Sequence, residues 1–454
     1  MELLDRDETL EVARRVLAAS TADETEVTLH STSDRFVRFA ESGPTQSADR
    51  GRFQLAVRAR FDGPDGRREA RATCDGIDLA LCEATVARAV ELARCAPPDP
   101  ELPPLGGAVE VEERRADDAT LGHSFEEKAG WVRMALDACA SSQLVPAGLA
   151  QTSGTACGLV NSAGREVWGS RSRAAFSLTA SAPGFEGGSG FAEQISERTV
   201  DLDTARVIAR AVGKAEDNRD PVPIEPGAYT VVLEPAAVSS LLLFASYRGW
   251  GAQEVHEKSS FLCGRQGERV FPETLSIADD AGNPVYAGFA FDGEGSPRRR
   301  VSLVESGVLG GPVTDTRWAA RLGRENTGHS LPQPNSHGPM ATNPVVTPGT
   351  QSVEDLIQGV ERGLLVTQFH YTNMIDPKDL TLTGMTRNGT FSIRDGRLCG
   401  AVRNLRFTES LVGSFGRISG VGRELEVAGA LFDGEVICPA LRIEGFRFTS
   451  STDF

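Results

Sequence analysis

Three prolines fall within six residues in the run Pro221-Val-Pro-Ile-Glu-Pro226. Each proline lacks a backbone N–H and fixes its own φ, so neither a helix nor an interior strand continues through such a run. The run therefore predicts a boundary between two domains, one covering residues 1–220 and the other residues 221–454. A chain of 454 residues is long enough for two domains that each bury a core.

The segment before this boundary alternates between helical and strand-like periodicity. Residues at 124–142 begin with a Ser-x-x-Glu capping box, which is typical of a helix N-terminus. Turn residues at 63–66 and 161–164 predict two hairpins. The same periodicity predicts helices over 7–20, 77–96, 124–142 and 201–217, and strands at 26–31, 35–42, 52–61, 67–74, 145–153, 156–170 and 171–182.

The segment after the boundary is dominated by short alternating runs with Gly, Asn and Asp turns. It opens with a strand-like run at 227–235 and a helical run at 236–249, and a second helix is expected at 352–363. The remainder predicts a sheet or barrel. The predicted fold class is α+β, with an N-terminal α/β layer domain followed by a β-rich, barrel-like C-terminal domain.

Charge and composition exclude several classes of protein. A net charge of −16, from 63 acidic and 47 basic residues, opposes binding to nucleic acid. No window approaches the roughly 18–20 apolar residues of a membrane helix, and the acidic first residues do not resemble a secretory signal. The eight scattered cysteines indicate reduced thiols. We therefore expect a cytoplasmic protein that contacts neither nucleic acid nor membrane.

The dipeptide His256-Glu257 is the strongest hint of chemistry in the sequence. Zinc peptidases of the H-E-x-x-H class place two histidines one helical turn apart, and the glutamate deprotonates a zinc-bound water. Here no second histidine follows within five residues. One histidine with Cys263 would lack the three protein ligands of a catalytic zinc site. No G-x-S-x-G elbow and no phosphate-binding glycine motif is present.

A long irregular segment at 323–344 is the other candidate site. Stretches of more than twenty residues without periodicity are unusual inside a domain unless they line a site or an interface. A strand-like run at 364–371 ends in His370-Tyr371. We therefore predict contact with substrate or partner at five residues, namely His329, Asn335, His337, His370 and Tyr371.

Three longer segments carry a family resemblance. Residues 364–410 contain Thr-Gly-Met-Thr-Arg-Asn-Gly-Thr-Phe, which resembles the C-terminal signature of the TldD/PmbA family. Residues 259–280 resemble the segment that follows the motif helix of that family, and residues 158–180 resemble its Asn-x-x-Gly strand pair. The resemblance spans essentially the whole chain and implies two subunits enclosing an internal cavity.

The family has two kinds of subunit, and the resemblance favours one of them. TldD-type subunits hold a catalytic metal with an H-E-x-x-x-H helix and a distal Cys, whereas PmbA-type (TldE) subunits lack these ligands. Here Phe261 stands at the second His position, and Cys438 lies directly before Pro439. The resemblance therefore implies a PmbA/TldE-type chain that binds no cofactor itself. It would form a heterodimer with a TldD-like subunit that supplies zinc, and would hold an unfolded or modified peptide.

Two alternatives remain open at the level of sequence. The first is a stand-alone homodimeric peptidase or amidase that acts on a small peptide-like metabolite. It would use Glu257 as the base and bind zinc through His256 together with Cys263, His337 or His370. The second is a peptide-binding scaffold with no hydrolytic activity.

Overall fold

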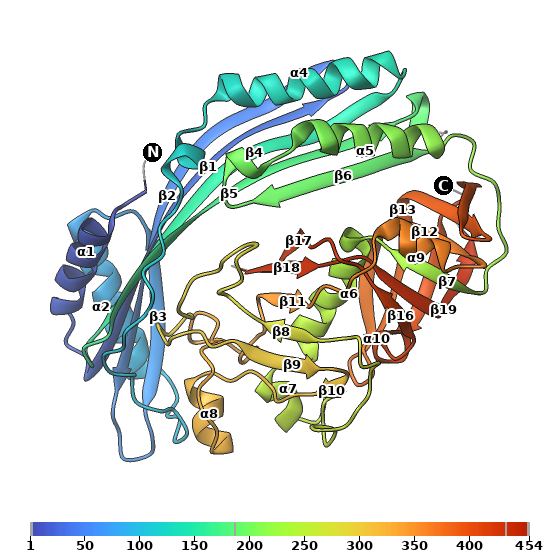
Figure 1. The fold of residues 1–454 in the computed structure, drawn as a ribbon. Coiled ribbons are helices and arrows are strands. Elements are labelled where there is room, and N and C mark those ends of the chain that lie inside the picture. The colour runs from blue at the N-terminus through green and yellow to red at the C-terminus, as the bar shows by residue number, and fades with distance from the viewer. Residues whose placement is uncertain (1–2, 186–187, 432–433, 452–454) are drawn as a thin grey trace.

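The computed structural model describes residues 3–185, 188–431 and 434–451. Its first half forms one long sheet that arches over the second half, as Figure 1 shows. The second half contains two further sheets. The structure is therefore a mixed α/β fold with separate sheets on the two sides of the proline-rich run.

The first sheet has six antiparallel strands in the order β3-β2-β1-β4-β5-β6. The predicted strands at 26–31 and 35–42 are one continuous strand in the structure, because the polar residues between them pair with both neighbours, as Asp34 does with Arg50 and Ser153. The two turns predicted at 63–66 and 161–164 lie between consecutive strands. The strands are β1 Glu24–Ala40, β2 Gly43–Phe61, β3 Arg68–Asp75, β4 Val145–Asn161, β5 Glu166–Ser181 and β6 Ser189–Ser196.

The helices of this half cover two regions of the sheet. The capping box predicted at Ser124 and Glu127 is present, with each residue bonding to the backbone N–H of the other. The helices α1 and α2 pack on one core of the sheet, and α4 and α5 pack on another. The four predicted helices are confirmed. Their bounds are α1 Arg6–Ala18, α2 Leu79–Cys95, α4 Phe125–Ser141 and α5 Thr204–Asp217. This half also contains the short helices α3 Asp118–Gly122, η1 Pro183–Phe185 and η2 Thr199–Asp201.

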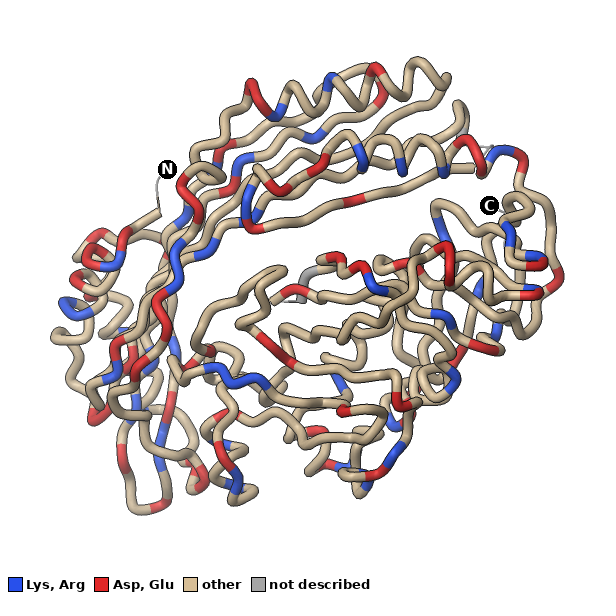
Figure 2. Tube along the Cα trace, in the orientation of Figure 1, with Lys and Arg blue, Asp and Glu red and all other residues tan. Residues whose placement is uncertain are grey.

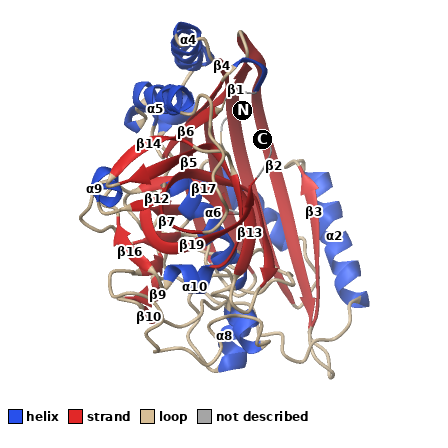
Figure 3. Cartoon of the chain, turned by 90° about the vertical axis from the view of Figure 1, so that its right-hand side faces the viewer, coloured by secondary structure: helices blue, strands red, loops and turns tan. Residues whose placement is uncertain are grey.

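The barrel predicted for the second half is confirmed. Its five strands follow the order β12-β7-β19-β15-β13, and pairing between β12 and β13 closes the ring, which Figure 3 shows end on. Closure leaves these strands without the exposed edges that an open sheet has. Two shorter strands extend the barrel sheet: β14 Arg397–Ala401 pairs with β13, and β16 Ile418–Val421 pairs with β19. The barrel strands are β7 Ala228–Leu233, β12 Arg362–Asp376, β13 Thr381–Arg394, β15 Leu405–Ser410 and β19 Leu441–Ser451.

The third sheet lies between the barrel and the arching sheet. Its order is β10-β9-β8-β11-β18-β17. The helix expected at 352–363 is shorter in the structure, because α9 ends at Gln358 and the chain enters β12 at Arg362. The remaining elements are β8 Ile277–Asp279, β9 Val301–Glu305, β10 Val308–Leu309, β11 Pro344–Val346, β17 Glu426–Leu431, β18 Gly434–Cys438, α6 Pro235–Arg248, α7 Ala252–His256, α8 Thr316–Leu322, α9 Val353–Gln358 and α10 Leu411–Phe415.

Apolar cores lie within each half and also between the halves. One inter-half cluster packs Tyr286 and Ile437 against Ala175 and Ile195, and another packs Phe289 and Phe291 against Leu159. All eight cysteines are free thiols. Figure 2 shows acidic and basic residues interspersed over both halves. Within the described residues, no helix is long and apolar enough to cross a membrane.

Candidate functional site

The His256-Glu257 dipeptide lies at the C-terminal end of the short helix α7, where both residues are exposed. The imidazole of His256 packs near the ring of Trp318, with ring centroids 5.4 Å apart. The Glu257 carboxylate accepts a hydrogen bond of 3.0 Å from Nε2 of Gln253. Because α7 spans only five residues, it ends before another turn could present a second ligand on the same face.

Phe261 and Cys263 follow this helix and pack inward. Phe261 is 4% exposed and makes an edge-to-face contact with Trp250, at 6.5 Å between ring centroids. The Cys263 thiol donates to the carbonyl of Val255 at 3.3 Å. Phe261, which stands four residues after Glu257, is therefore part of the hydrophobic core of the second half.

The predicted contact residues of the 323–344 segment have different environments. His329 is 1% exposed, and its Nε2 lies 3.0 Å from Oδ1 of Asp279. Burial opposes ionisation of Asp279, but His329, Arg298 and the backbone N–H of Asn343 outweigh it and lower the pKa of that carboxyl. His337 is exposed beside Tyr247, and Oδ1 of Asn335 accepts hydrogen bonds from the backbone N–H groups of the turn. His329 is thus internal, whereas His337 lies at the surface.

The four candidate zinc donors do not converge. His256 packs on Trp318, Cys263 bonds to a carbonyl, His337 packs on Tyr247, and His370 accepts a hydrogen bond from Arg387. A catalytic zinc needs about three protein ligands directed at one point. No three His, Cys, Asp or Glu residues gather in that way within the described ranges 3–185, 188–431 and 434–451. The donor set therefore does not fit a zinc ion.

His370 and Tyr371 border a cleft of about 1100 Å³. We call it the polar cleft. It lies between the ends of β5 and β6 on one side and β12, β13 and the segment 402–404 on the other. Its polar lining includes Ser189, Asn218, Asp220, Arg387, Asn388 and Arg403. This volume exceeds that of typical small-molecule pockets and suits a longer ligand.

The rim of the polar cleft is shaped by an irregular stretch of β12. Register shifts interrupt its pairing with β13, and Tyr371 has φ of 49° and is 72% exposed. Nη1 of Arg387 donates to Nε2 of His370 at 2.6 Å. Desolvation and the charge of Arg387 both lower the pKa of His370, so the neutral imidazole is favoured. The cleft therefore presents an exposed tyrosine beside an imidazole whose Nε2 is held by Arg387.

A second, smaller cavity of about 70 Å³ lies where the first half meets the second. We call it the junction cavity. Its floor is formed by β1, β2, β3 and β4, through residues such as His30, Arg58 and Cys157. Phe289, Asp292 and Arg298 of the second half cover it, together with the segment 329–333. Cys157 and His30 are cross-strand partners, with Sγ 3.8 Å from Nε2.

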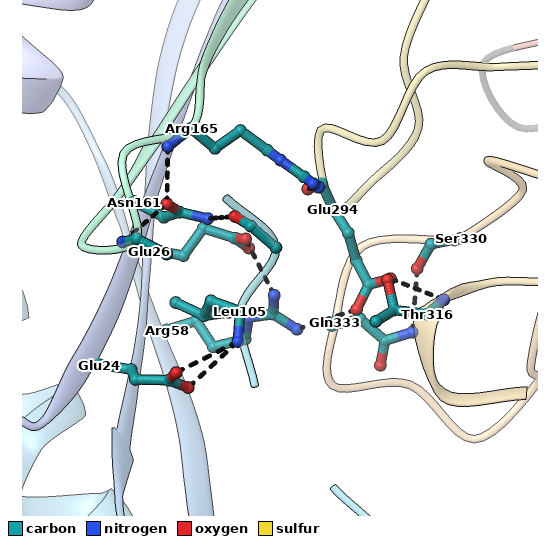
Figure 4. A network of polar contacts seen from close by, with 12 residues as sticks. Glu24, Glu26, Arg58, Leu105, Asn161, Arg165, Glu294, Thr316, Ser330 and Gln333 are labelled. Carbon is teal, nitrogen blue, oxygen red and sulfur yellow. Dashed lines mark hydrogen bonds and ion pairs between the residues drawn. The ribbon is translucent and has the colours of Figure 1, made fainter. Parts of the chain in front are cut away.

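Buried ion pairs join the two halves beside this cavity. Arg58 is 3% exposed and donates from Nη2 to Glu26 at 2.9 Å, while its Nη1 lies 3.6 Å from Oε1 of Glu294. Figure 4 shows Glu26 and Arg58 facing Glu294 across the gap between the halves. Arg165 crosses the same gap and donates to the carbonyl of Glu294 at 2.8 Å. These charges are held between the halves and are not exposed to solvent.

Several carboxyl groups near the junction resist ionisation. Burial raises the pKa of Glu26, and burial together with Glu294 raises the pKa of Asp292 to about 7. Asp315, which caps α8 by accepting from the backbone N–H of Trp318, also has its pKa raised to about 7 by burial and by Glu294. The junction therefore contains groups that change charge near neutral pH.

The sequence-based candidates fall into three separate places. His370 and Tyr371 lie together at the polar cleft, and His329 lies at the junction cavity. His256 and Glu257 line neither cavity. The sequence did not single out Arg58, which lines the junction cavity, or Arg387, which lines the polar cleft. Alternation in the run 52–61 places Arg58 with the polar members and opposite the apolar ones, so this pattern predicts an exposed side chain there, whereas the structure buries it.

Comparison with known proteins assigns the second half to a family. Residues 226–450 match the model of the PmbA/TldA metallopeptidase C-terminal domain. A Haemophilus influenzae protein named metalloprotease TldD homolog is 30% identical over 162 residues, covering 35% of this chain and 34% of that protein. The metalloprotease PmbA of Escherichia coli O157:H7 is 24% identical over 196 residues, covering 42% and 40%. The matched segments thus span less than half of each relative.

Solved structures match over nearly the whole chain. TldE from Thermococcus kodakarensis superposes with a TM-score of 0.85 at 21% identity, covering 97% of this chain and 99% of that one. A Thermotoga maritima protein gives a TM-score of 0.84 at 19% identity, covering 97% and 100%. These likenesses establish the shared fold. The chain is a metallopeptidase-like protein, and it belongs to the TldD/PmbA family.

Proposed function

We propose that this chain is the non-metal subunit of a TldD/TldE-type metallopeptidase. It would form a heterodimer with a TldD-like subunit in the cytoplasm and hold an extended peptide beside the zinc of that partner. The observation that carries the proposal is the separation of the candidate zinc donors. A relative from Saccharolobus solfataricus is named zinc metalloprotease TldD homolog, whereas His256, Cys263, His337 and His370 each have a different internal contact here.

The polar cleft supplies the surface for an extended peptide. Strand β14 is the last strand of its sheet, residues 397–400 are exposed, and the chain leads from it directly to Arg403 at the cleft. An extended peptide can pair with such an edge through backbone hydrogen bonds, which requires no particular peptide sequence. Such a subunit would contribute to catalysis by positioning the substrate.

The first experiment measures metal content and peptidase activity of the chain alone and with a TldD-type partner from the same genome. We expect the chain alone to carry no stoichiometric zinc and to cleave no unfolded peptide, and we expect the mixture to form a complex that does. Stoichiometric zinc in the isolated chain, lost in His256→Ala, would instead favour a stand-alone enzyme. Absence of any active complex would leave only a binding role.

A second experiment tests the cleft within the active complex. Tyr371→Ala should raise KM for an unfolded peptide several-fold, because the exposed ring is lost from the cleft, and should leave zinc content and complex formation unchanged. The matched control is Val285→Ala, which removes another exposed apolar side chain, 40% exposed, outside the cleft. Equal KM values for the two variants would refute the role of the cleft.

A further inference from the structure

Residues 381–408 are basic in a chain that is acidic overall. The whole chain has a net charge of −16, whereas this segment contains five arginines, no lysine and one acidic residue, Asp395. It includes β13 and β14 and reaches into β15, and it contributes residues 385–388 and 402–404 to the wall of the polar cleft. We call it the arginine segment. Its arginines are all exposed, and they are Arg387, Arg394, Arg397, Arg403 and Arg406.

These five arginines are not paired with acidic side chains. Elsewhere in the second half an exposed arginine is neutralised, as Arg417 is by Glu409 at 3.0 Å. Within the described ranges, no Asp or Glu lies within ion-pair distance of any arginine of the segment. Arg387 instead donates to the imidazole of His370. Exposed charges of one sign without counter-charges produce a positive potential, which attracts an anionic ligand.

The polar cleft shares this excess of positive charge. Among the described residues, the side chains that line it and carry a permanent charge near neutral pH are Arg387, Arg403 and Asp220. Asp220 is exposed and is not paired with either arginine. Because a guanidinium binds a carboxylate through two parallel N–H donors, the two arginines suit the side chain of Asp or Glu and repel that of Lys.

The free strand edge beside the cleft lies within the same segment. The backbone of Val222 bonds to Ala401 and Arg403, so the part of this edge left open is 397–400. Backbone pairing of a peptide with this edge would be independent of the peptide sequence. Arg397 begins the open edge and Arg403 lies beyond its end. Their charges would therefore select among peptides that backbone pairing alone treats alike.

We propose that the arginine segment selects acidic peptides, with Arg387, Arg397 and Arg403 facing their Asp or Glu side chains. This inference rests on the proposed function, because it names the substrate class of the same peptide-holding surface. Two features favour a peptide over a nucleic acid as the anion. The open edge at 397–400 can pair with a peptide backbone, and the net charge of −16 opposes a long polyanion such as nucleic acid.

Fluorescence anisotropy with the full chain measures this preference. Three labelled, unstructured octapeptides share their Ala, Ser and Tyr positions and differ in carrying three Glu, three Gln or three Lys residues. At low ionic strength, Kd for the Glu peptide should be about tenfold or more below that for the Gln peptide, because each exposed ion pair strengthens binding by up to about fivefold. The Lys peptide should bind most weakly. The advantage of the Glu peptide should shrink at about 0.5 M salt.

Charge reversal separates selection from an effect on folding. The double variant Arg387→Glu, Arg403→Glu should lose the preference for the Glu peptide and bind the Lys peptide about tenfold more tightly than the wild type does. Damage to the fold cannot produce such a gain. The matched control is Arg133→Glu, which reverses an exposed arginine on α4 and should change no Kd.

Each of the other outcomes contradicts a different claim. Equal Kd values for the Glu and Gln peptides, or an unaltered preference in the double variant, would refute acidic selection and leave the peptide-holding role intact. Failure of all three peptides to bind would refute both. A single-stranded oligonucleotide that displaces the Glu peptide at equal charge concentration would overturn the choice of a peptide as the ligand.

Discussion

The junction cavity and the polar cleft both lie between the same two halves, but they differ in how the halves meet. At the junction, Arg58 and Arg165 reach across and bond to Glu294 and its neighbours, with almost no exposure to solvent. At the cleft, a side-chain hydrogen bond from Ser189 to Asn388 joins the two sides, and Tyr371 and Arg403 are exposed. Buried charge fixes the halves at one end, while the other end is left open for a larger ligand.

The largest effect should follow from breaking the junction. Arg58→Ala leaves Glu26 and Glu294 buried without the cation that pairs with both, whereas Glu69 keeps its pair with Arg60, and we expect a loss of about 3–5 kcal/mol in the free energy of unfolding. The control is Arg52→Ala on the same strand, whose pair with Asp75 is exposed and is worth less than about 1 kcal/mol. Denaturant titration measures both. Similar losses in the two variants would show that burial of Arg58 does not matter.

The second prediction uses the pH dependence of the junction. The pKa of Asp315 is raised to about 7 in the folded protein, so its contribution to stability is fully present below the ordinary Asp value and is lost as pH rises toward 7. The difference amounts to at most about 4 kcal/mol. Asp315→Asn keeps the cap of α8, since Asn caps helices about as well as Asp, but removes the titration.

The measurement is the free energy of unfolding at several pH values between 4 and 8. The wild-type protein should lose more stability over this range than Asp315→Asn does. Asp203→Asn is a matched control, because Asp203 caps α5 in the same way. The helix α5 packs on the first sheet and is not part of the junction. If the pH profile of Asp315→Asn parallels that of the wild type, Asp315 does not titrate as inferred.

The third prediction concerns the bond that spans the polar cleft. Ser189→Ala removes the 2.7 Å hydrogen bond from Oγ to Oδ1 of Asn388, and we expect a loss of about 1 kcal/mol, far below that of Arg58→Ala. Ser392→Ala removes a bond within the barrel sheet, to the carbonyl of Gly400, and serves as the control. A loss of several kcal/mol for Ser189→Ala would mean that the cleft is held as firmly as the junction.

The two regions also differ in how far the sequence predicted them. Helices such as α4 were predictable because periodicity and caps are local, and the barrel was predicted from short alternating runs with turns. His370 and Tyr371 were singled out because they end a strand-like run. At the junction, His329 was singled out from the irregular segment, but the pairs were not predictable: Arg58 meets Glu294 236 positions along the chain, and His30 meets Cys157 127 positions away. Such pairs depend on the order of the strands in the sheet and on how the two halves pack together. The local spacing of residue types determines neither.

The smallest effect should be at the rim of the cleft, where His370 accepts from Arg387. Desolvation and Arg387 lower the pKa of His370, so the contribution of this contact to stability is present above the ordinary His value and is lost as pH falls through the lowered one. In Arg387→Met the pKa of His370 should move upward, toward its ordinary value, with a stability change within about 0.5 kcal/mol. The imidazole C–H signals followed by NMR between pH 5 and 8 measure the shift.

This direction is opposite to that expected at the junction, where raised carboxyl pKa values favour the folded state at lower pH. Assignment by His370→Asn separates the signal from those of the other five histidines, since the sequence has six. The matched control is Arg403→Met, which removes another exposed arginine of the cleft that is not bonded to His370. A pKa that stays depressed in Arg387→Met would mean that desolvation alone sets it. The cleft would then already exclude water at its rim around His370. The difference in solvent exposure between the cleft and the junction would be smaller than the exposed side chain of Tyr371 suggests.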